Sequence, residues 1–300
     1  MYKNSAENFQ NKTVVALGTF DGIHLGHQRI IKDAISYARR RGLKCVVTTF
    51  DPHPQQFIDA KEHLKLLTTL GERKKLFKKL GVGIVKVFKF NKELRNLNCK
   101  EFVRKFIVNE LKAGVVFVGY DYEFGKGRSG GVKELRIFGE KYDFKVKMVR
   151  PFKSEGIVVK SSFIRRLLAM GDFRKALSLL GHYYNVSGQV IRGAGRGSEI
   201  GFPTANLFVD RHKLIPVHGV YVGVIGKRRC LVNIGVRPTF KTEQAAVEVF
   251  IPKFHGNLYG KKLEVKILKR LRNEIKFPNS ELLKEQIKKD IDACLSYKLQ

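Results

Sequence analysis

The sequence lacks the segments that would place a protein in a membrane or outside the cell. Within its 300 residues, no apolar run approaches the roughly 20 residues that a helix needs to cross a bilayer. The first twelve residues, MYKNSAENFQNK, contain no apolar core of a secretory signal. We therefore expect a soluble cytoplasmic protein with no membrane partner.

Cysteine is scarce and scattered. The four cysteines are Cys45, Cys99, Cys230 and Cys294, and no two of them form a CxxC pair. This spacing argues against disulfides and against a metal site built from cysteine. The chain also lacks internal repeats and low-complexity segments, and 43% of its residues are hydrophobic, which is typical of a globular protein. A length of 300 residues favours two domains.

Acidic residues are few relative to basic ones. The chain has 58 Lys and Arg against 27 Asp and Glu, a formal net charge of +31, and the surplus extends over both halves. Such a field attracts anions, including nucleotides and nucleic acid. The simpler interpretation is a solvated basic surface. Because the basic residues form no patch interleaved with aromatics and no RNA-binding signature is present, we expect no specific nucleic-acid partner.

The first 180 residues alternate between two kinds of segment. Apolar β-branched runs, typical of buried strands, occupy 13–17, 44–49, 83–88, 114–118 and 144–149. Helical patterns lie between them at 27–41, 71–80, 99–112 and 131–142. The alternation predicts a Rossmann-like α/β domain, a parallel sheet with helices on both faces. In such sheets ligands bind beyond the carboxyl ends of the strands.

The pattern changes in the second half. Helical segments at 161–170 and 172–180 are followed by short strand-like runs from about Tyr183 to Lys269, separated by Gly, Pro and Asn. These runs predict a small antiparallel β-barrel. A final helix is expected at 280–295, with Ser280 as its cap. We place the domain boundary near Gly181, giving domains 1–181 and 182–300.

One decapeptide, GTFDGIHLGH at 18–27, lies where the first strand gives way to the first helix. Glycines at 18, 22 and 26 allow a tight turn and close approach of a ligand to the backbone. A helix N-terminus suits phosphate, and His24 and His27 could add donors to the same anion. The alternatives are histidines of the core or metal ligands, although no cysteine or second acidic cluster completes a zinc set.

The decapeptide resembles the H-x-G-H signature of nucleotidyltransferases. With TFDPHP at 49–54, GYDYEFGKGRSG at 119–130 and SSFIR at 161–165, it resembles the FAD synthetase half of prokaryotic bifunctional riboflavin kinase/FAD synthetases. The chain departs from that pattern at Lys160, where a Ser is usual, and at Ser162, which stands for a common Thr. The resemblance implies adenylyl transfer, in which the FMN phosphate attacks the α-phosphorus of ATP and pyrophosphate leaves.

The resemblance also assigns roles to residues of the first half. His24 and His27 would stabilise the transferring phosphate. The other nucleotide-binding candidates are Gly18, Phe20, Asp21, Gly26, Asp51, His53, Asp121, Ser161, Ser162 and Arg165. For Asp21, Asp51 and His53, a role as ordinary turn residues stays open.

In the second half, IRGAGRGSEIGFPTANL at 191–207 combines a Gly-Arg loop with a polar turn. Backbone N–H groups and guanidinium groups of such a loop can wrap a phosphate. The hydroxyl and amide oxygens of PTAN suit Mg²⁺, although a simple proline turn would have the same sequence. The candidate residues are Arg192, Gly195, Arg196, Gly201, Pro203, Thr204 and Asn206.

This stretch, with NIGVRPTF at 233–240 and VEVFI at 247–251, resembles riboflavin kinase. The resemblance makes Thr204 and Asn206 ligands of Mg·ATP, and Glu248 the general base for the ribityl 5′-hydroxyl. Asn257 stands where that family often has Asp, which leaves its role in doubt.

We therefore expect a bifunctional enzyme that makes FMN from riboflavin and then FAD from FMN, with ATP and Mg²⁺, as a monomer by default. Two rivals are an enzyme that keeps only one of the two activities, and a nucleic-acid-binding protein suggested by the +31 charge.

Overall fold

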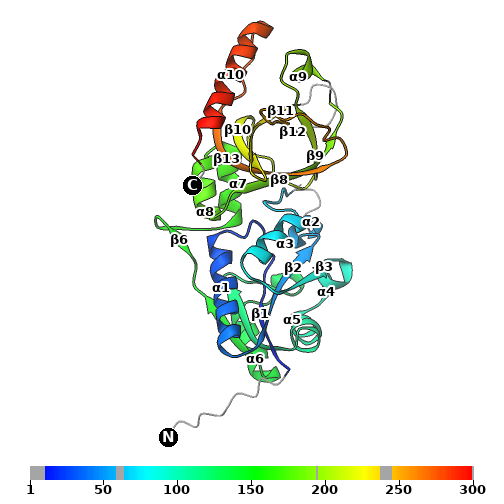
Figure 1. The fold of residues 1–300 in the computed structure, drawn as a ribbon. Helices are drawn as coiled ribbons and strands as arrows, with labels where there is room; N and C mark the ends of the chain where they lie inside the picture. The colour runs from blue at the N-terminus through cyan, green and yellow to red at the C-terminus, as the bar shows by residue number, and fades with distance from the viewer. Residues whose placement is uncertain (1–10, 59–63, 194, 237–244, 299–300) are drawn as a thin grey trace. The chain divides into compact units, whose positions relative to one another are not determined.

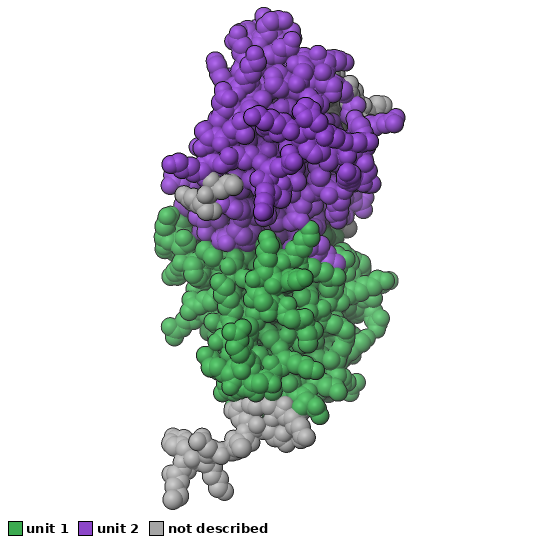
Figure 2. Space-filling model, viewed as in Figure 1, with its two compact units in different colours: residues 1–64, 73–160 green, residues 65–72, 161–300 purple. Residues whose placement is uncertain are grey.

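The computed structural model describes residues 11–58, 64–193, 195–236 and 245–298. The chain forms two compact units (Figure 2). Unit 1 comprises residues 1–64 and 73–160, and unit 2 comprises residues 65–72 and 161–300. Among the described residues, no helix has the length and apolar character needed to cross a membrane.

Unit 1 contains a five-stranded sheet with the order β3-β2-β1-β4-β5, in which all pairings are parallel (Figure 1). The strands are β1 (Thr13–Ala16), β2 (Lys44–Asp51), β3 (Ile84–Lys89), β4 (Ala113–Gly119) and β5 (Lys145–Val149). The parallel α/β domain expected from the sequence is therefore confirmed.

Helices connect these strands. They are α1 (Leu25–Arg40), α2 (Pro54–Ile58), α3 (Leu70–Lys79), α4 (Lys92–Asn96), α5 (Cys99–Phe102) with a π-helical continuation (Val103–Glu110), a 3₁₀ turn (Lys126–Arg128) and α6 (Val132–Tyr142). A small hairpin, β6 (Lys153–Ser154) with β7 (Ile157–Val158), ends the unit. Helix α1 begins two residues earlier than its periodicity predicted, because His24 caps it.

The sheet of unit 1 is buried on both faces. Alternate residues of β1 point to opposite sides, so Val15 packs with the helices α5 and α6, while Val14 and Ala16 pack with α1 and α3. This double burial explains why the central strands β1 and β4 are nearly continuous apolar runs rather than alternating ones.

Unit 2 contains a closed six-stranded antiparallel barrel with the order β10-β11-β12-β9-β8-β13, as the sequence predicted (Figure 1). The strands are β8 (Tyr184–Ile191), β9 (Ala205–Val209), β10 (Gly219–Ile225), β11 (Arg228–Val236), β12 (Ala245–Phe250) and β13 (Lys262–Arg272). The helices are α7 (Ser161–Met170), α8 (Phe173–Leu180), α9 (Arg196–Glu199) and α10 (Ser280–Ser296).

Caps define the ends of these helices. Gly181, with φ of 68°, ends α8 as a left-handed cap. The expected Ser280 cap of α10 is wrong, because the Asn279 side chain accepts the hydrogen bond from Leu282 N at 3.0 Å and Ser280 is the first helical residue. The Arg272 guanidinium of β13 donates three hydrogen bonds to the two carboxylate oxygens of Asp290, which holds α10 against the barrel.

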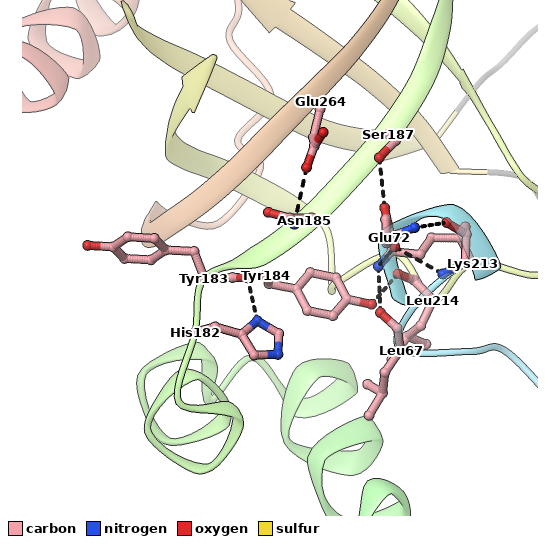
Figure 3. Close-up of polar contacts among 11 residues, drawn as sticks. Leu67, Glu72, His182, Tyr183, Tyr184, Asn185, Ser187, Lys213, Leu214 and Glu264 are labelled. Carbon is pink, nitrogen blue, oxygen red and sulfur yellow. Dashed lines mark hydrogen bonds and ion pairs between the residues drawn. The ribbon is translucent and has the colours of Figure 1, made fainter. Parts of the chain in front are cut away.

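Residues 65–72 belong to unit 2 although they are distant in sequence from the rest of it. A buried ion pair joins this segment to the barrel (Figure 3). Lys213 Nζ donates to Glu72 Oε2 at 2.8 Å, and the two side chains are 0% and 2% exposed. Lys213 also donates to Leu67 O and lies over the Tyr184 ring. Ser187 Oγ donates to the other carboxylate oxygen of Glu72 at 2.9 Å. Both charges therefore have polar partners, as burial requires.

Candidate active sites

The GTFDG loop of unit 1 has an unusual backbone. Phe20, Gly22 and Ile23 adopt φ angles of 52°, 82° and 39°, and the left-handed region is costly for Phe and Ile. The Phe20 side chain is buried and occupies the space that a Cβ on Gly18 would need, 2.8 Å from such an atom. Backbone strain of this kind persists where the surroundings enforce it, and it concentrates at functional sites.

Two residues outside this loop, Thr49 and Arg73, hold it through the Thr19 carbonyl. Thr49 Oγ1 donates to Thr19 O at 2.7 Å. Arg73 Nη1 donates both to Thr19 O at 2.9 Å and to Thr49 Oγ1 at 2.6 Å. Arg73 is buried, so its side chain supports the loop from inside the unit and is not a surface charge. No local sequence pattern identifies Arg73, because its contact with Thr19 joins residues that are 54 positions apart.

His24 and His27 lie together at the start of α1. Their rings stack with centroids 3.6 Å apart, and His24 Nδ1 accepts a hydrogen bond from His27 N. The Phe20 ring meets His27 edge-on at 5.3 Å. A neutral imidazole that accepts at Nδ1 carries its proton on Nε2, so His24 presents an N–H donor at that nitrogen.

Gly26 makes this arrangement possible. A Cβ on Gly26 would lie 3.2 Å from the His24 ring, so a larger residue would press on the imidazole. Asp21, the remaining polar residue of the loop, is buried. The structure thus gathers the predicted residues of this motif into one strand–helix turn, with donors suited to an anion.

Other predicted residues lie at or beyond the carboxyl ends of β2 and β4, the two strands that flank β1. Asp51 is the exposed last residue of β2. His53 is buried, and its Nδ1 accepts from Gln55 N at the start of α2, which is the turn role left open above. Asp121 follows β4, is exposed, and pairs with Lys160 Nζ at 3.5 Å. The hydrogen bond and the charge interaction with Tyr120 are the main causes that raise the pKa of Lys160, and the Asp121 charge adds to them.

Ser161, Ser162 and Arg165 lie on the first turns of α7 in unit 2. Ser161 and Arg165 are half-buried, and Ser162 is exposed. Their spacing of three and four residues brings the hydroxyl and guanidinium groups to one side of the helix start. The partial positive charge at the N-terminal end of a helix favours an anionic ligand.

In the barrel, the Gly-Arg loop folds back onto the PTAN turn. A Cβ on Gly193 would collide with the Asn206 amide, and one on Gly197 would lie 3.4 Å from Thr204 Oγ1. Phe202 N donates to Gly197 O at 2.7 Å, which closes the loop. Thr204 and Asn206 therefore lie close to the backbone of two glycines of the loop, Gly197 and Gly193.

The remaining loop candidates follow the same pattern. Arg192 and Pro203 are exposed. Gly195, with φ of 76°, precedes Arg196 at the start of α9, and Gly201 has φ of 89°. The left-handed glycines give the loop its tight turns.

Glu248 lies directly opposite Asn206 across the pairing of β12 with β9. Residues directly opposite in an antiparallel pair have side chains on the same face, with Cβ atoms roughly 5 Å apart. The predicted base and the predicted metal ligand are thus neighbours, although 42 positions separate them in sequence. Asn233 lies opposite Glu248 on its other side, on β11. The rest of the NIGVRPTF motif, residues 237–240, lies outside the described residues.

The side-chain oxygens of Thr204 and Asn206 suit a hard cation such as Mg²⁺ that is also coordinated by the phosphates of a nucleotide. Among the described residues, no group of three His, Cys, Asp or Glu could hold a metal ion. Thr204 and Asn206 instead offer neutral oxygens, and Gly193 and Gly197 allow the loop backbone to approach these two side chains closely. Mg²⁺ is commonly held by one or two protein oxygens together with substrate phosphates, so the residues fit Mg·ATP.

Asn257, whose role the sequence left in doubt, stabilises a turn. Its Oδ1 accepts a hydrogen bond from Tyr259 N at 2.9 Å, the contact of an Asx turn.

Comparison with known proteins matches both halves of the chain. Residues 6–163 match the FAD synthetase family, and residues 180–298 match the riboflavin kinase family. The bifunctional riboflavin kinase/FMN adenylyltransferase of Listeria monocytogenes is 38% identical, over 92% of this chain and 90% of the relative. The enzyme of that name from Bacillus subtilis is 36% identical, over 96% and 93%. The chain belongs to the bifunctional riboflavin kinase/FMN adenylyltransferase family.

The fold of this chain also occurs in a solved structure. The Streptococcus pneumoniae protein named macrolide-efflux protein superposes with a TM-score of 0.86 and 31% identity, covering 96% of this chain and 95% of that chain. In this family the adenylyltransferase activity belongs to the FAD synthetase module and the kinase activity to the barrel module, which confirms the order of functions expected from the sequence.

Proposed function

We propose that the chain converts riboflavin to FAD in two ATP-dependent steps, with the kinase in domain 182–300 and the adenylyltransferase in domain 1–181. The observation that carries the kinase half is the cross-strand pairing of Glu248 with Asn206. The observation that carries the adenylyltransferase half is the stacked pair His24 and His27 at the start of α1. A monomer located in the cytoplasm remains our expectation.

In the kinase step, the Glu248 carboxylate accepts the proton of the ribityl 5′-hydroxyl. The hydroxyl oxygen bonds to the γ-phosphorus of ATP, the bond from that phosphorus to the β–γ bridging oxygen breaks, and ADP leaves. Thr204 and Asn206 would hold Mg²⁺ against the phosphates, and the ion, when bound, neutralises charge on the transferring group. The backbone of the Gly-Arg loop, with Arg192 and Arg196, binds the phosphates. Such transfer depends mainly on alignment and charge neutralisation.

In the adenylyl step, an oxygen of the FMN phosphate bonds to the α-phosphorus of a second ATP. The bond from that phosphorus to the α–β bridging oxygen breaks, and pyrophosphate leaves. His24 and His27 donate hydrogen bonds to the α-phosphate as its charge develops. No enzyme nucleophile is required. Ser161, Ser162 and Arg165 stay predicted triphosphate ligands, and Asp121 a predicted nucleotide contact.

Two substitutions test the assignment of the steps. His27→Ala should lower FAD formation from supplied FMN about 10²-fold or more, the usual cost of a lost oxyanion donor, while riboflavin phosphorylation continues. Glu248→Gln keeps the shape of the side chain but removes the base, and should lower FMN formation by about 10²- to 10⁴-fold. FAD formation from supplied FMN should be unchanged in Glu248→Gln.

Matched controls come from groups of the same type elsewhere. His212 is an exposed histidine, and Glu264 is a carboxylate on another barrel strand. His212→Ala and Glu264→Gln should leave both steps within about twofold of the parent, as expected for residues away from the chemistry. If His27→Ala and Glu248→Gln each impaired both steps equally, the assignment of one step to each domain would be wrong.

A further inference from the structure

Lys160 stands where the resemblance to FAD synthetases expects a serine, so the resemblance gives this lysine no role. A lysine at this position adds a positive charge and a longer side chain. The residue lies between β7 and Ser161, and it is the last residue of unit 1. The contacts of Lys160 within unit 1 therefore indicate what the added charge does.

The backbone next to Lys160 lies against the histidine turn of unit 1. A Cβ on Gly26 would lie 3.6 Å from the carbonyl oxygen of Val159, the residue before Lys160. Gly26 lies between His24 and His27, the two residues proposed above to bind the α-phosphate. Lys160 therefore directly follows a backbone group that borders the proposed site of the transferring phosphate.

The Lys160 side chain reaches the carboxyl end of β4, the strand that pairs with β1. Its Nζ pairs with Asp121 Oδ2 at 3.5 Å. A Cβ on Gly119, the last residue of β4, would lie 3.3 Å from Asp121 Oδ1 and 3.5 Å from Ile30 of α1. The ammonium thus lies at the edge of the sheet where β1 and β4 end, which is the edge where such sheets bind their ligands.

Two acceptors orient the ammonium group without using all of its donors. A lysine ammonium has three N–H donors. Lys160 makes a side-chain hydrogen bond with Tyr120 and an ion pair with Asp121, and its Nζ lies 5.6 Å from the centroid of the Tyr120 ring. Its side chain is 50% exposed. Among the described residues these contacts account for two of the three donors, so one donor is available to a ligand.

Other charged groups at this edge of the sheet have both signs. Three carboxylates lie in or after the strand ends, at Asp21 after β1, Asp51 at the end of β2 and Asp121 after β4. Basic side chains end the two outer strands, at Lys89 of β3 and Arg150 after β5. Lys160 differs from these two because its ammonium lies at the end of β4, which flanks the central strand β1.

We propose that Lys160 is a further nucleotide-binding residue of the adenylyltransferase site, whose ammonium, oriented by Tyr120 and Asp121, binds the ATP phosphates that leave as pyrophosphate. This rests on the adenylyl step proposed above. When the bond from the α-phosphorus to the bridging oxygen breaks, negative charge develops on the departing pyrophosphate, and a cation beside it stabilises that charge. A serine offers only a neutral hydrogen bond, whereas lysine offers a charge-assisted one.

The test measures FAD formation from supplied FMN by the full chain, together with its inhibition by added pyrophosphate. Lys160→Ala should raise the KM for ATP about 10-fold and raise the inhibition constant of pyrophosphate by a similar factor, because a charge-assisted hydrogen bond is lost. Lys160→Ser, which restores the residue that the resemblance expects, should also bind pyrophosphate more weakly than the parent. Lys160→Arg keeps the charge and should recover most of the affinity. The KM for ATP in the kinase step should not change.

Asp121→Asn separates phosphate binding from a role in orienting Asp121. This variant keeps the shape of the side chain and removes the negative charge beside the ammonium. A phosphate ligand of Lys160 then loses a like-charged neighbour, so pyrophosphate should inhibit about two- to fivefold more strongly, the range expected for an exposed ion pair. If Lys160 served only to orient Asp121, Lys160→Ala and Asp121→Asn would shift the inhibition constant in the same direction.

Lys147→Ala is the matched control. Lys147 of β5 is also an exposed lysine of unit 1, and its Nζ lies 5.1 Å from the centroid of the Tyr37 ring. This variant removes a similar charge from the middle of a strand, so the inhibition constant of pyrophosphate should stay within about twofold of the parent. A thermal scan of each variant shows whether its fold is retained.

The outcomes separate the role of Lys160 from the adenylyl step itself. A parent protein that forms no FAD from FMN would refute the step and the role of Lys160 with it. An active parent combined with unchanged values for ATP and pyrophosphate in Lys160→Ala would refute the role of Lys160 alone. Weaker pyrophosphate inhibition in both Lys160→Ala and Asp121→Asn would also refute it. If Lys160→Ala lowers the Tm, Lys160→Arg decides, because weak inhibition in a stable arginine variant would exclude a role for the charge.

Discussion

The substitution Lys213→Met should lower the free energy of unfolding of unit 2 by more than the same substitution lowers it at a surface lysine. The Lys213 side chain is 0% exposed and donates to Glu72 at 2.8 Å and to Leu67 O. Methionine preserves most of the length of the side chain but removes the ammonium group that lies over the Tyr184 ring. Among the described residues, Glu72, which is 2% exposed, then keeps the hydrogen bonds from Thr69 N and Ser187 Oγ. Removing one member of a buried pair typically costs about 3–5 kcal/mol, because the other charge is left uncompensated.

The assay is equilibrium unfolding in urea, followed by far-UV circular dichroism with a parallel thermal scan. At about 2–4 °C per kcal/mol for a unit of this size, the loss corresponds to a Tm lowered by about 6–20 °C. Lys262→Met, at an exposed position of β13, is the control and should change the stability by less than about 0.5 kcal/mol.

A double substitution separates the ion pair from the packing. Glu72→Met combined with Lys213→Met removes both charges, and replacing a buried pair by apolar groups is often neutral. The double variant should therefore be more stable than Lys213→Met alone. A Lys213→Met protein within about 1 kcal/mol of the parent, or a double variant that loses the sum of both single costs, would refute the reasoning.

Further predictions concern the two sites and the thiols. Gly193→Ala should displace the Asn206 amide and raise the KM of the kinase for Mg·ATP about 10-fold, as expected for a displaced positioning group, with FAD formation from FMN unchanged in a coupled assay. Arg73→Met removes the donor that holds the GTFDG loop and should lower FAD formation about 10-fold or more while FMN formation continues, measured by resolving both products. Burial raises the pKa of the Cys45 thiol to about 11, so its thiolate is scarce at pH 8 and increases only as the pH approaches 11. Native protein should therefore react with a thiol reagent at pH 8 fastest at Cys99, and Cys99→Ser should remove the fast phase; rapid labelling of Cys45 would contradict its burial.

Local sequence patterns predicted most helices and strands, because burial and backbone preference leave a signal within each segment. The runs 13–17 and 114–118 are apolar over their whole length because β1 and β4 are covered on both faces. The glycine at 181 ended α8 for a reason visible in the sequence, since glycine adopts a positive φ at low cost. Asparagine and serine both cap helices well, so the sequence alone does not decide between Asn279 and Ser280. The extended backbone of Asn279 makes it the cap of α10.

Contacts between distant segments were not predictable in the same way. Glu248 alternates with valines, which leaves its face open, and only the strand register puts it between Asn206 and Asn233. The packing of residues 65–72 on Lys213 has no local signal either, because a lysine and a glutamate 141 positions apart look like two surface charges. Register and burial depend on the whole fold, and a single sequence carries them only through the pattern of each strand.

The most direct test of the two-step function is a time course with the purified full chain, riboflavin, ATP and Mg²⁺, in which riboflavin, FMN and FAD are separated and quantified. We predict that FMN rises first and then declines as FAD accumulates, with one ADP formed for each riboflavin consumed and one pyrophosphate for each FAD. FMN as the final product, even when FMN itself is supplied with fresh ATP, would contradict the adenylyltransferase step. Riboflavin left unchanged would contradict the kinase step.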